Sequence, residues 1–133
     1  MIVVDTNAIA YLLIAGEHTR TATRVLRKDS DWVAPVLWRS EFRSVLAMYI
    51  RKGHLDLPDA IEIMEAAESL MRESEFEVIS SEVLRFVSIS GCSAYDCEFV
   101  ALAHTLGVLM VTSDTKILNA FPSIAVSPDN FVS

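Results

Sequence analysis

The run Ile2-Val3-Val4-Asp5 constrains the fold of this chain more than any other stretch. Its three β-branched residues have no polar face, which is typical of a short strand buried on both sides, as in a parallel sheet. Thr6-Asn7 follows Asp5, and these three residue types suit a turn or the start of a helix, here an apolar segment that reaches Gly16. We therefore expect Asp5 at the carboxyl end of an inner strand, where open α/β sheets bind ligands.

The rest of the chain alternates between short apolar strands and amphipathic helices. This alternation predicts an α/β fold, a three-layer α/β/α sandwich around a parallel sheet of four to five strands, in a single domain over residues 1–133. The strands at 2–4 and 108–112 are the most apolar and should be neighbours at the centre. Further strands are expected at 32–34, 76–79 and 124–126, and helices at 8–15, 19–28, 36–51, 57–74, 80–90, 93–106 and 116–120.

The charge of the chain limits its partners. A net charge of −7 argues against a large non-specific nucleic-acid surface, although it leaves room for a local basic rim. Arg20, Arg24 and Arg27 share one face of a predicted helix, which is either a solvated face or an RNA-facing edge. The longest apolar run, 8–15, is too short to span a bilayer, and no secretory signal is expected, so we predict a cytoplasmic protein with no membrane partner.

Neither the cysteines nor the histidines of this chain are spaced as the ligands of a zinc site. Cys92 and Cys97 lack the further ligands that would complete four, and we expect them to be buried reduced thiols. None of the three histidines has a partner three or four residues away, so we interpret them as ordinary surface or boundary residues: His18, His54 and His104. A row of acids in the 57–74 region is interpreted as solvated surface: Glu62, Glu65, Glu68 and Glu73.

Four other carboxylates occupy equivalent positions in the predicted topology. Asp5 and Asp114 each follow an apolar strand, and Glu41 and Asp96 each lie in the early turns of a helix. Strand carboxyl ends and the amino ends of the following helices lie at the same edge of such a sheet, so the four can converge. Glu98 lies about 200° around the helix from Asp96 and is expected to point elsewhere. Taken singly, each of the four could be no more than a helix cap or a surface acid.

A cluster of carboxylates needs a cation. Like charges within about 4–6 Å of one another raise pKa values and cost stability, and helix amino ends offset only about 0.3–1 kcal/mol each. An all-oxygen set with room for water suits Mg²⁺ or Mn²⁺. Such a site can lower the pKa of a bound water and stabilise the charge on a phosphate under attack. Phosphodiester hydrolysis is the reaction class that needs both.

Four motifs give the chain a resemblance to the PIN-domain family. They are Val3-Val4-Asp5-Thr6-Asn7, the segment 35–41 that ends in Glu41, the segment 93–103 around Asp96, and Val111-Thr112-Ser113-Asp114. Each motif is weak alone, but together they occur in the order of the family and cover essentially the whole chain. In size and build the chain is similar to the VapC-type toxins of toxin–antitoxin pairs.

The resemblance implies a metal-dependent ribonuclease in which an acidic quartet holds Mg²⁺ or Mn²⁺: Asp5, Glu41, Asp96 and Asp114. It also implies that Thr6 or Asn7 supports Asp5 by hydrogen bonding, and that Thr112 occupies a position where the family often has a hydroxyl. A homodimer and a small VapB-like antitoxin that blocks the cleft are implied as well. Arg39 or Arg43 is a candidate contact for RNA phosphates, although the simpler interpretation of both is surface charge.

Other functions agree less well with the residues. A phosphatase with an aspartyl nucleophile would need a second Asp at position 7, where Asn7 stands, and a phosphoacceptor receiver domain would need paired acids after the first strand. A PIN nuclease outside toxin–antitoxin pairs, acting in RNA processing, stays open. So does a non-catalytic PIN-like module that binds RNA or protein. The sequence does not say which RNA would be cut.

Overall fold

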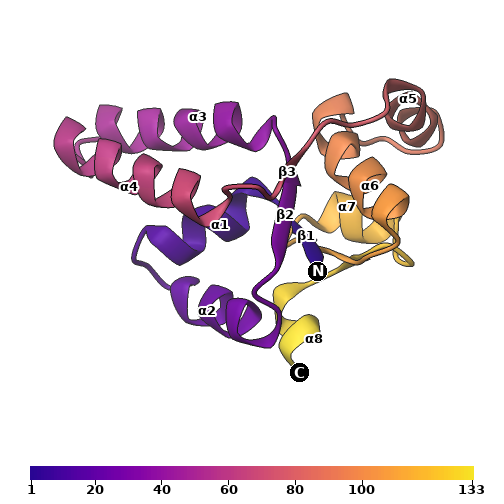
Figure 1. Ribbon diagram of the computed structural model, residues 1–133, viewed down its shortest axis with the longest axis horizontal. Coiled ribbons are helices and arrows are strands. Elements are labelled where there is room, and N and C mark those ends of the chain that lie inside the picture. Colours follow the sequence, from indigo (N-terminus) through magenta and orange to yellow (C-terminus); the bar gives the residue numbers. More distant parts are fainter.

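A parallel sheet of five strands forms the centre of the computed structural model, which describes residues 1–133 (Figure 1). Its strands lie in the order β3-β2-β1-β4-β5, and every neighbouring pair is parallel. The prediction that the first and fourth strands are neighbours at the centre is confirmed. The strands are β1 (Ile2–Val4), β2 (Trp32–Pro35), β3 (Glu75–Phe76), β4 (Met110–Val111) and β5 (Ala125–Val126).

Helices cover both faces of the sheet, which confirms the predicted three-layer sandwich. In Figure 1, α1 to α4 lie on one side of the sheet and α5 to α7 on the other. None of them combines the length and the hydrophobicity that a membrane span requires. The helices are α1 (Thr6–Leu13), α2 (Thr19–Lys28), α3 (Trp38–Arg51), α4 (Leu57–Leu70), α5 (Ser80–Ser88), α6 (Ala94–Leu106), α7 (Thr115–Ala120) and α8 (Pro128–Val132).

The core lies where the two central strands meet the apolar helix α6. Every residue of β1 and β4 is buried, as expected for parallel strands with helices on both faces. Helix α6 packs on β1, β2 and β4, and it ends at Gly107, whose φ of 68° suits a residue without a side chain. Cys92 and Cys97 are buried and unbridged, as predicted.

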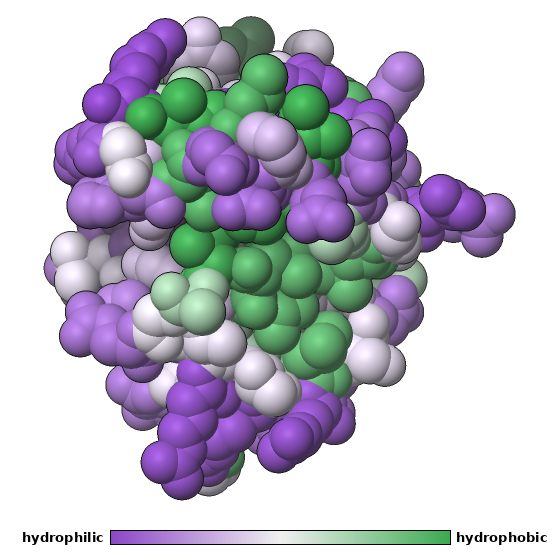
Figure 2. Space-filling model, turned by 90° about the vertical axis from the view of Figure 1, so that its left-hand side faces the viewer, coloured by the Kyte–Doolittle hydropathy of each residue, from purple (hydrophilic) through white to green (hydrophobic).

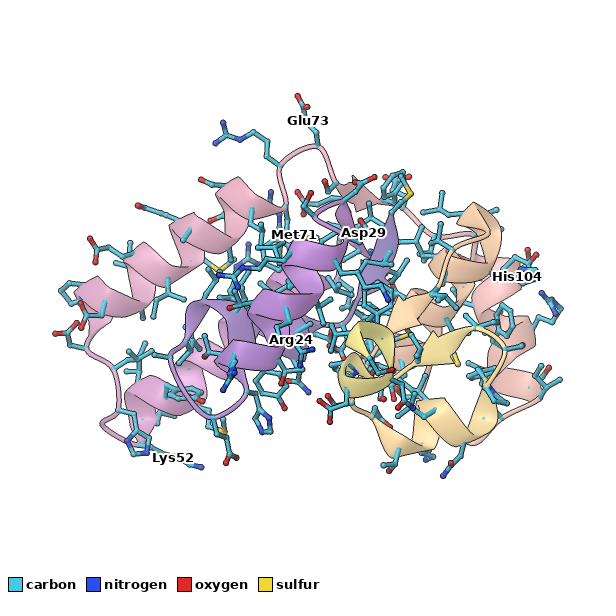
Figure 3. The ribbon with its side chains drawn as sticks, turned by 90° about the horizontal axis from the view of Figure 1, so that it is seen from below. Arg24, Asp29, Lys52, Met71, Glu73 and His104 are labelled. Carbon is cyan, nitrogen blue, oxygen red and sulfur yellow. The ribbon has the colours of Figure 1, made fainter.

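Beyond shifts of about two residues at other element ends, the structure differs from the prediction in three places. Helix α4 ends at Leu70 rather than near residue 74, because the chain turns through Glu73 with a φ of 64°; Glu73 projects outward from this turn in Figure 3. The third strand is Glu75–Phe76, earlier than the predicted 76–79. Helix α8 was not predicted, although Ser127 followed by Pro128 is a recognised helix start, and the Ser127 hydroxyl does accept from the Asn130 N–H at 3.2 Å.

Apolar side chains also gather on the outside of the molecule. Figure 2 looks at the side on which α3 and α4 lie and shows a continuous apolar area across it. Exposed hydrophobic residues of these two helices include Met48, Ile50, Leu57 and Ile61. An apolar area of this kind on a surface is typical of a contact with another protein.

Candidate active site

Asp5 lies at the carboxyl end of β1, as predicted, and begins α1. Its Oδ1 accepts a hydrogen bond from the Ala8 N–H at 2.9 Å, and its Oδ2 accepts one from the Thr112 hydroxyl at 2.6 Å. The register explains the second bond: Val4 is paired with Val111, so the next residues, Asp5 and Thr112, leave the two strands side by side. A carboxylate held at both oxygens has a fixed orientation.

Asp114 lies beside Asp5 at the end of β4. Its Oδ1 accepts from the Lys116 and Ile117 N–H groups at 2.9 and 3.2 Å, and thereby caps α7. The Asp114 N–H donates to the Thr112 hydroxyl oxygen at 3.1 Å. The buried Thr112 therefore connects the two strand-end acids, donating to one and accepting from the other.

Glu41 and Asp96 approach the same edge from the first turns of α3 and α6. The Oε1 of Glu41 accepts from the Thr6 hydroxyl at 2.7 Å. The structure thus corrects the prediction that Thr6 or Asn7 supports Asp5: Asp5 is the cap of α1, and Thr6, the first residue of that helix, turns to α3 instead. Asp96 is placed by its own helix start, where the Asp96 N–H donates to the Ser93 hydroxyl at 3.1 Å.

The four carboxylates line one cavity of about 400 Å³. Its other lining residues are neutral, and no lysine or arginine is among them. Two strand ends and two helix starts, spread from residue 5 to residue 114, therefore meet at one site. The cavity lining is completed by Thr6, Asn7, Ser44, Val45, Phe99, Met110 and Ile117.

This arrangement stores unfavourable electrostatic energy. Burial raises the pKa of Asp5, and the charges of Asp114 and Asp96 act in the same direction, while the bonds from Thr112 and Ala8 oppose them. Burial also raises the pKa of Glu41, helped by the charges of Asp96 and Asp5 and opposed by the bond from Thr6. A buried carboxylate with like-charged neighbours and no cation is a group whose ionised form is under-stabilised.

The donor set fits a hard divalent cation. No three side chains of Asp, Glu, His or Cys are grouped closely enough to make a ready metal cage. Mg²⁺ does not need one, because it is usually bound through one or two carboxylates and keeps several waters. An open cavity lined by four carboxylates and three hydroxyl or amide side chains meets that requirement, and a cation there would offset the charge that raises the pKa of Asp5.

The two arginines predicted as RNA contacts lie in different surroundings. The Arg39 guanidinium donates to both carboxylate oxygens of Glu75, at 2.6 and 2.7 Å, and to Glu68 at 2.8 Å. These bonds tie Arg39 to α4 and β3, and its role as an RNA contact stays a prediction. Glu68 is a surface acid, as predicted, but it is paired with Arg39. Arg43 is exposed and has no ion-pair partner, so its role as an RNA contact stays a prediction.

Glu98 does not line the acidic cavity, in agreement with the prediction, but its charge acts on one residue of the site. Its charge contributes to the raised pKa of Glu41, and burial raises the pKa of Glu98 itself. Glu41, on α3, is near enough to feel the charges of both Asp96 and Glu98, which the angle between the two around α6 does not predict.

Comparison with known proteins finds a matching protein family and a similar ribonuclease. Residues 2–122 match the PIN domain family. Ribonuclease VapC3 from Pyrobaculum aerophilum is 28% identical over 127 residues, which cover 92% of this chain and 96% of that protein.

Two solved structures share the fold at lower identity. The crystal structure of PAE2754 from Pyrobaculum aerophilum has a TM-score of 0.77 at 20% identity. The matched region covers 98% of this chain and 92% of the PAE2754 chain. The crystal structure of FitAcB from Neisseria gonorrhoeae has a TM-score of 0.76 at 18% identity. The matched region covers 96% of this chain and 98% of the FitAcB chain. The match over residues 2–122, together with this topology, shows that the chain belongs to the PIN domain family.

Proposed function

We propose that this protein is a Mg²⁺- or Mn²⁺-dependent endoribonuclease. The observation that carries the proposal is the position of Asp5, a half-buried carboxylate whose pKa is raised by burial and by Asp114 and Asp96, in a cavity that holds no basic side chain. Such a site favours a divalent cation, and phosphodiester hydrolysis uses one. The similarity to a protein named Ribonuclease VapC3 supports RNA as the substrate.

Each residue of the site has a definable task in this reaction. Asp5, Asp96 and Asp114 would hold the cation directly or through water, and Glu41 would complete the set. The bound cation would supply a water of lowered pKa and would stabilise negative charge on the phosphate. Thr112 fixes the orientation of Asp5 and Thr6 fixes that of Glu41, so both hydroxyls position carboxylates rather than touch RNA.

Cleavage of RNA by two carboxylate variants tests this function. Asp5→Asn and Asp96→Asn should abolish Mg²⁺-dependent cleavage of single-stranded RNA while the circular dichroism spectrum remains that of a folded protein. Glu65→Gln, which removes an exposed carboxylate of α4 outside the cavity lining, is the matched control and should cleave normally. Undiminished cleavage by both site variants would rule the proposal out.

We also propose that the nuclease is the toxin of a type II, VapBC-like pair. The similarity to Ribonuclease VapC3 over nearly the whole of both chains supports this. So does the apolar area in Figure 2, since the predicted homodimer and the predicted VapB-like antitoxin both require such surfaces. We expect the gene to lie beside a short reading frame whose product forms a complex with this chain and inhibits cleavage. Cleavage unaffected by that product would instead favour a nuclease of RNA processing.

A further inference from the structure

A second cavity adjoins the acidic one at Asp5. It has a volume of about 370 Å³, and Asp5 lines both cavities. Its walls come from α1, α2, α7 and the segment 127–129 at the start of α8. The side chains include apolar groups such as Val25 and Leu118 and hydroxyls such as Ser113 and Ser127. Pockets for small ligands have this size and this mixture of apolar walls with a few polar groups.

Two aromatic rings stand at this cavity. Tyr11 and His18 both line it, and their ring centroids are 4.5 Å apart with planes tilted by 38°. The His18 side chain is 57% exposed, so one aromatic surface is available to a ligand. Unstacked bases of single-stranded nucleic acid bind to aromatic faces of this kind.

Trp32 also lines the cavity and has an unmet hydrogen bond. Trp32 is only 2% exposed. Its indole Nε1 is the one buried side-chain nitrogen or oxygen of the protein without a hydrogen-bond partner. The other tryptophan differs, because the Trp38 indole donates to Glu75 at 2.9 Å. Because the Nε1 atom is shielded from solvent, another part of the indole ring borders the cavity. Trp32 therefore reports on a ligand in the cavity and does not donate to it.

The helix that walls this cavity also carries the densest positive charge of an acidic protein. Thr21, Ala22 and Val25 of α2 face the cavity, and the same helix bears three arginines without an ion-pair partner: Arg20, Arg24 and Arg27. Figure 3 shows Arg24 near the middle of the lower face. The three arginines lie on the outer face of α2, roughly opposite Ala22 and Val25, so they form a solvated face of this helix and no part of the cavity wall.

We propose that the second cavity holds one base of the RNA strand whose phosphate lies in the acidic cavity. The inference rests on the proposed function, because the shared residue Asp5 makes the two cavities adjacent subsites for one nucleotide. Tyr11 and His18 stack on the base, and the hydroxyls of the cavity, such as those of Ser113 and Ser127, bond to its edge. This subsite gives the enzyme a preference for the base next to the cut.

Two histidine variants test the stacking. His18→Ala should raise the KM for a single-stranded RNA by about fivefold or more, as expected for the loss of one stacking contact, and leave kcat nearly unchanged. His54→Ala is the matched control, since His54 is also exposed and packs against a tyrosine, Tyr49, but lines neither cavity. The base preference at one position of the cleavage site should relax in His18→Ala and in Tyr11→Leu, and Tyr11→Phe should keep it.

A binding measurement provides a readout that does not depend on cleavage. In the ¹⁵N spectrum of the Asp96→Asn protein with Mg²⁺, the Trp32 indole signal, assigned with Trp32→Phe, should shift on addition of a short single-stranded RNA. The same RNA with abasic riboses should not shift it, and the Trp38 signal should stay in place with both. A nucleoside monophosphate that shifts Trp32 as strongly as the RNA would show a free-nucleotide site and overturn the assignment to a strand.

The two proposals fail in different ways. If the protein cleaves RNA but His18→Ala and Tyr11→Leu keep the wild-type KM and base preference, the subsite is wrong and the nuclease stands. An RNA that binds without moving the Trp32 signal would likewise exclude the subsite and leave the nuclease standing. If the wild-type protein cleaves no RNA with Mg²⁺ or Mn²⁺ while RNA still shifts Trp32, the nuclease is wrong and the base pocket stands.

Discussion

Thr112 donates its hydroxyl hydrogen to the Oδ2 of Asp5 across 2.6 Å, although 107 residues separate the two in the chain. The same hydroxyl accepts from the Asp114 N–H at 3.1 Å. One small buried side chain therefore sets the relative position of the two strand-end carboxylates. The consequence is testable, because valine has nearly the shape of threonine and lacks only the hydroxyl.

Thr112→Val should lower cleavage at pH 6 by about tenfold, since a hydrogen bond to a charged group contributes ~1.5 kcal/mol or more. The Thr112 bond opposes the burial that raises the pKa of Asp5, so its loss leaves Asp5 protonated to a higher pH. The acid limb of the pH–rate profile should therefore move to higher pH. Thr112→Ser keeps the hydroxyl and should retain the wild-type profile. An unmoved acid limb in Thr112→Val would show that this bond does not tune Asp5.

The convergence of the acids could be predicted because it follows from topology. An apolar strand that ends in Asp5 and another that leads to Asp114 must be inner parallel neighbours, and their carboxyl ends then coincide. The helix start at Ser93 fixed the place of Asp96 in the same way. Each of these inferences needed only local patterns and the general rules of α/β sheets.

The partners of individual side chains could not be predicted in this way. The bond from Thr6 to Glu41 and the ion pairs of Arg39 with Glu75 and Glu68 join segments 29 to 36 residues apart. They depend on how far α3 and α4 are rotated about their axes, which hydrophobic periodicity does not fix to within a side chain. The second cavity was missed for the same reason, since its lining combines residues from several separate segments.

Without metal, Asp5 should make the fold less stable as the pH rises from its ordinary pKa of 3.8 through its raised pKa. A carboxylate whose pKa is raised by burial binds its proton more tightly in the folded state, so its contribution to stability is complete below the unfolded pKa and is lost as the pH passes the folded pKa. Asp5→Asn removes this charge, so the dependence of Tm on pH, measured in EDTA, should become weaker. Each 1 kcal/mol of destabilisation that the substitution removes should raise Tm by about 4 °C. Equal slopes for wild type and variant would mean that Asp5 is not under-stabilised.

Mg²⁺ should reverse that effect at neutral pH. At about 100 times its dissociation constant the ion should stabilise the wild-type protein by roughly 2.7 kcal/mol relative to EDTA. Differential scanning calorimetry of wild type, Asp5→Asn and the control Glu65→Gln measures this, and only Asp5→Asn should lose the response. If the wild-type protein has the same Tm in Mg²⁺, in Mn²⁺ and in EDTA, the result would favour a non-catalytic binding module.

Arg39→Lys should destabilise the fold by about 1–2 kcal/mol without altering the metal response, because a lysine cannot reproduce the two parallel bonds to Glu75. The Arg39 bond lowers the pKa of Glu75, so this stabilisation is present at neutral pH and is lost as Glu75 takes up its proton in acid. The difference between wild type and variant in urea unfolding should accordingly shrink below the usual glutamate pKa of 4.5. Arg43→Lys, at an exposed arginine one turn further along α3, should leave the unfolding midpoint unchanged. If Arg39→Lys unfolded like wild type but bound RNA more weakly, the guanidinium would after all be an RNA contact and its ion pairs would be exchangeable.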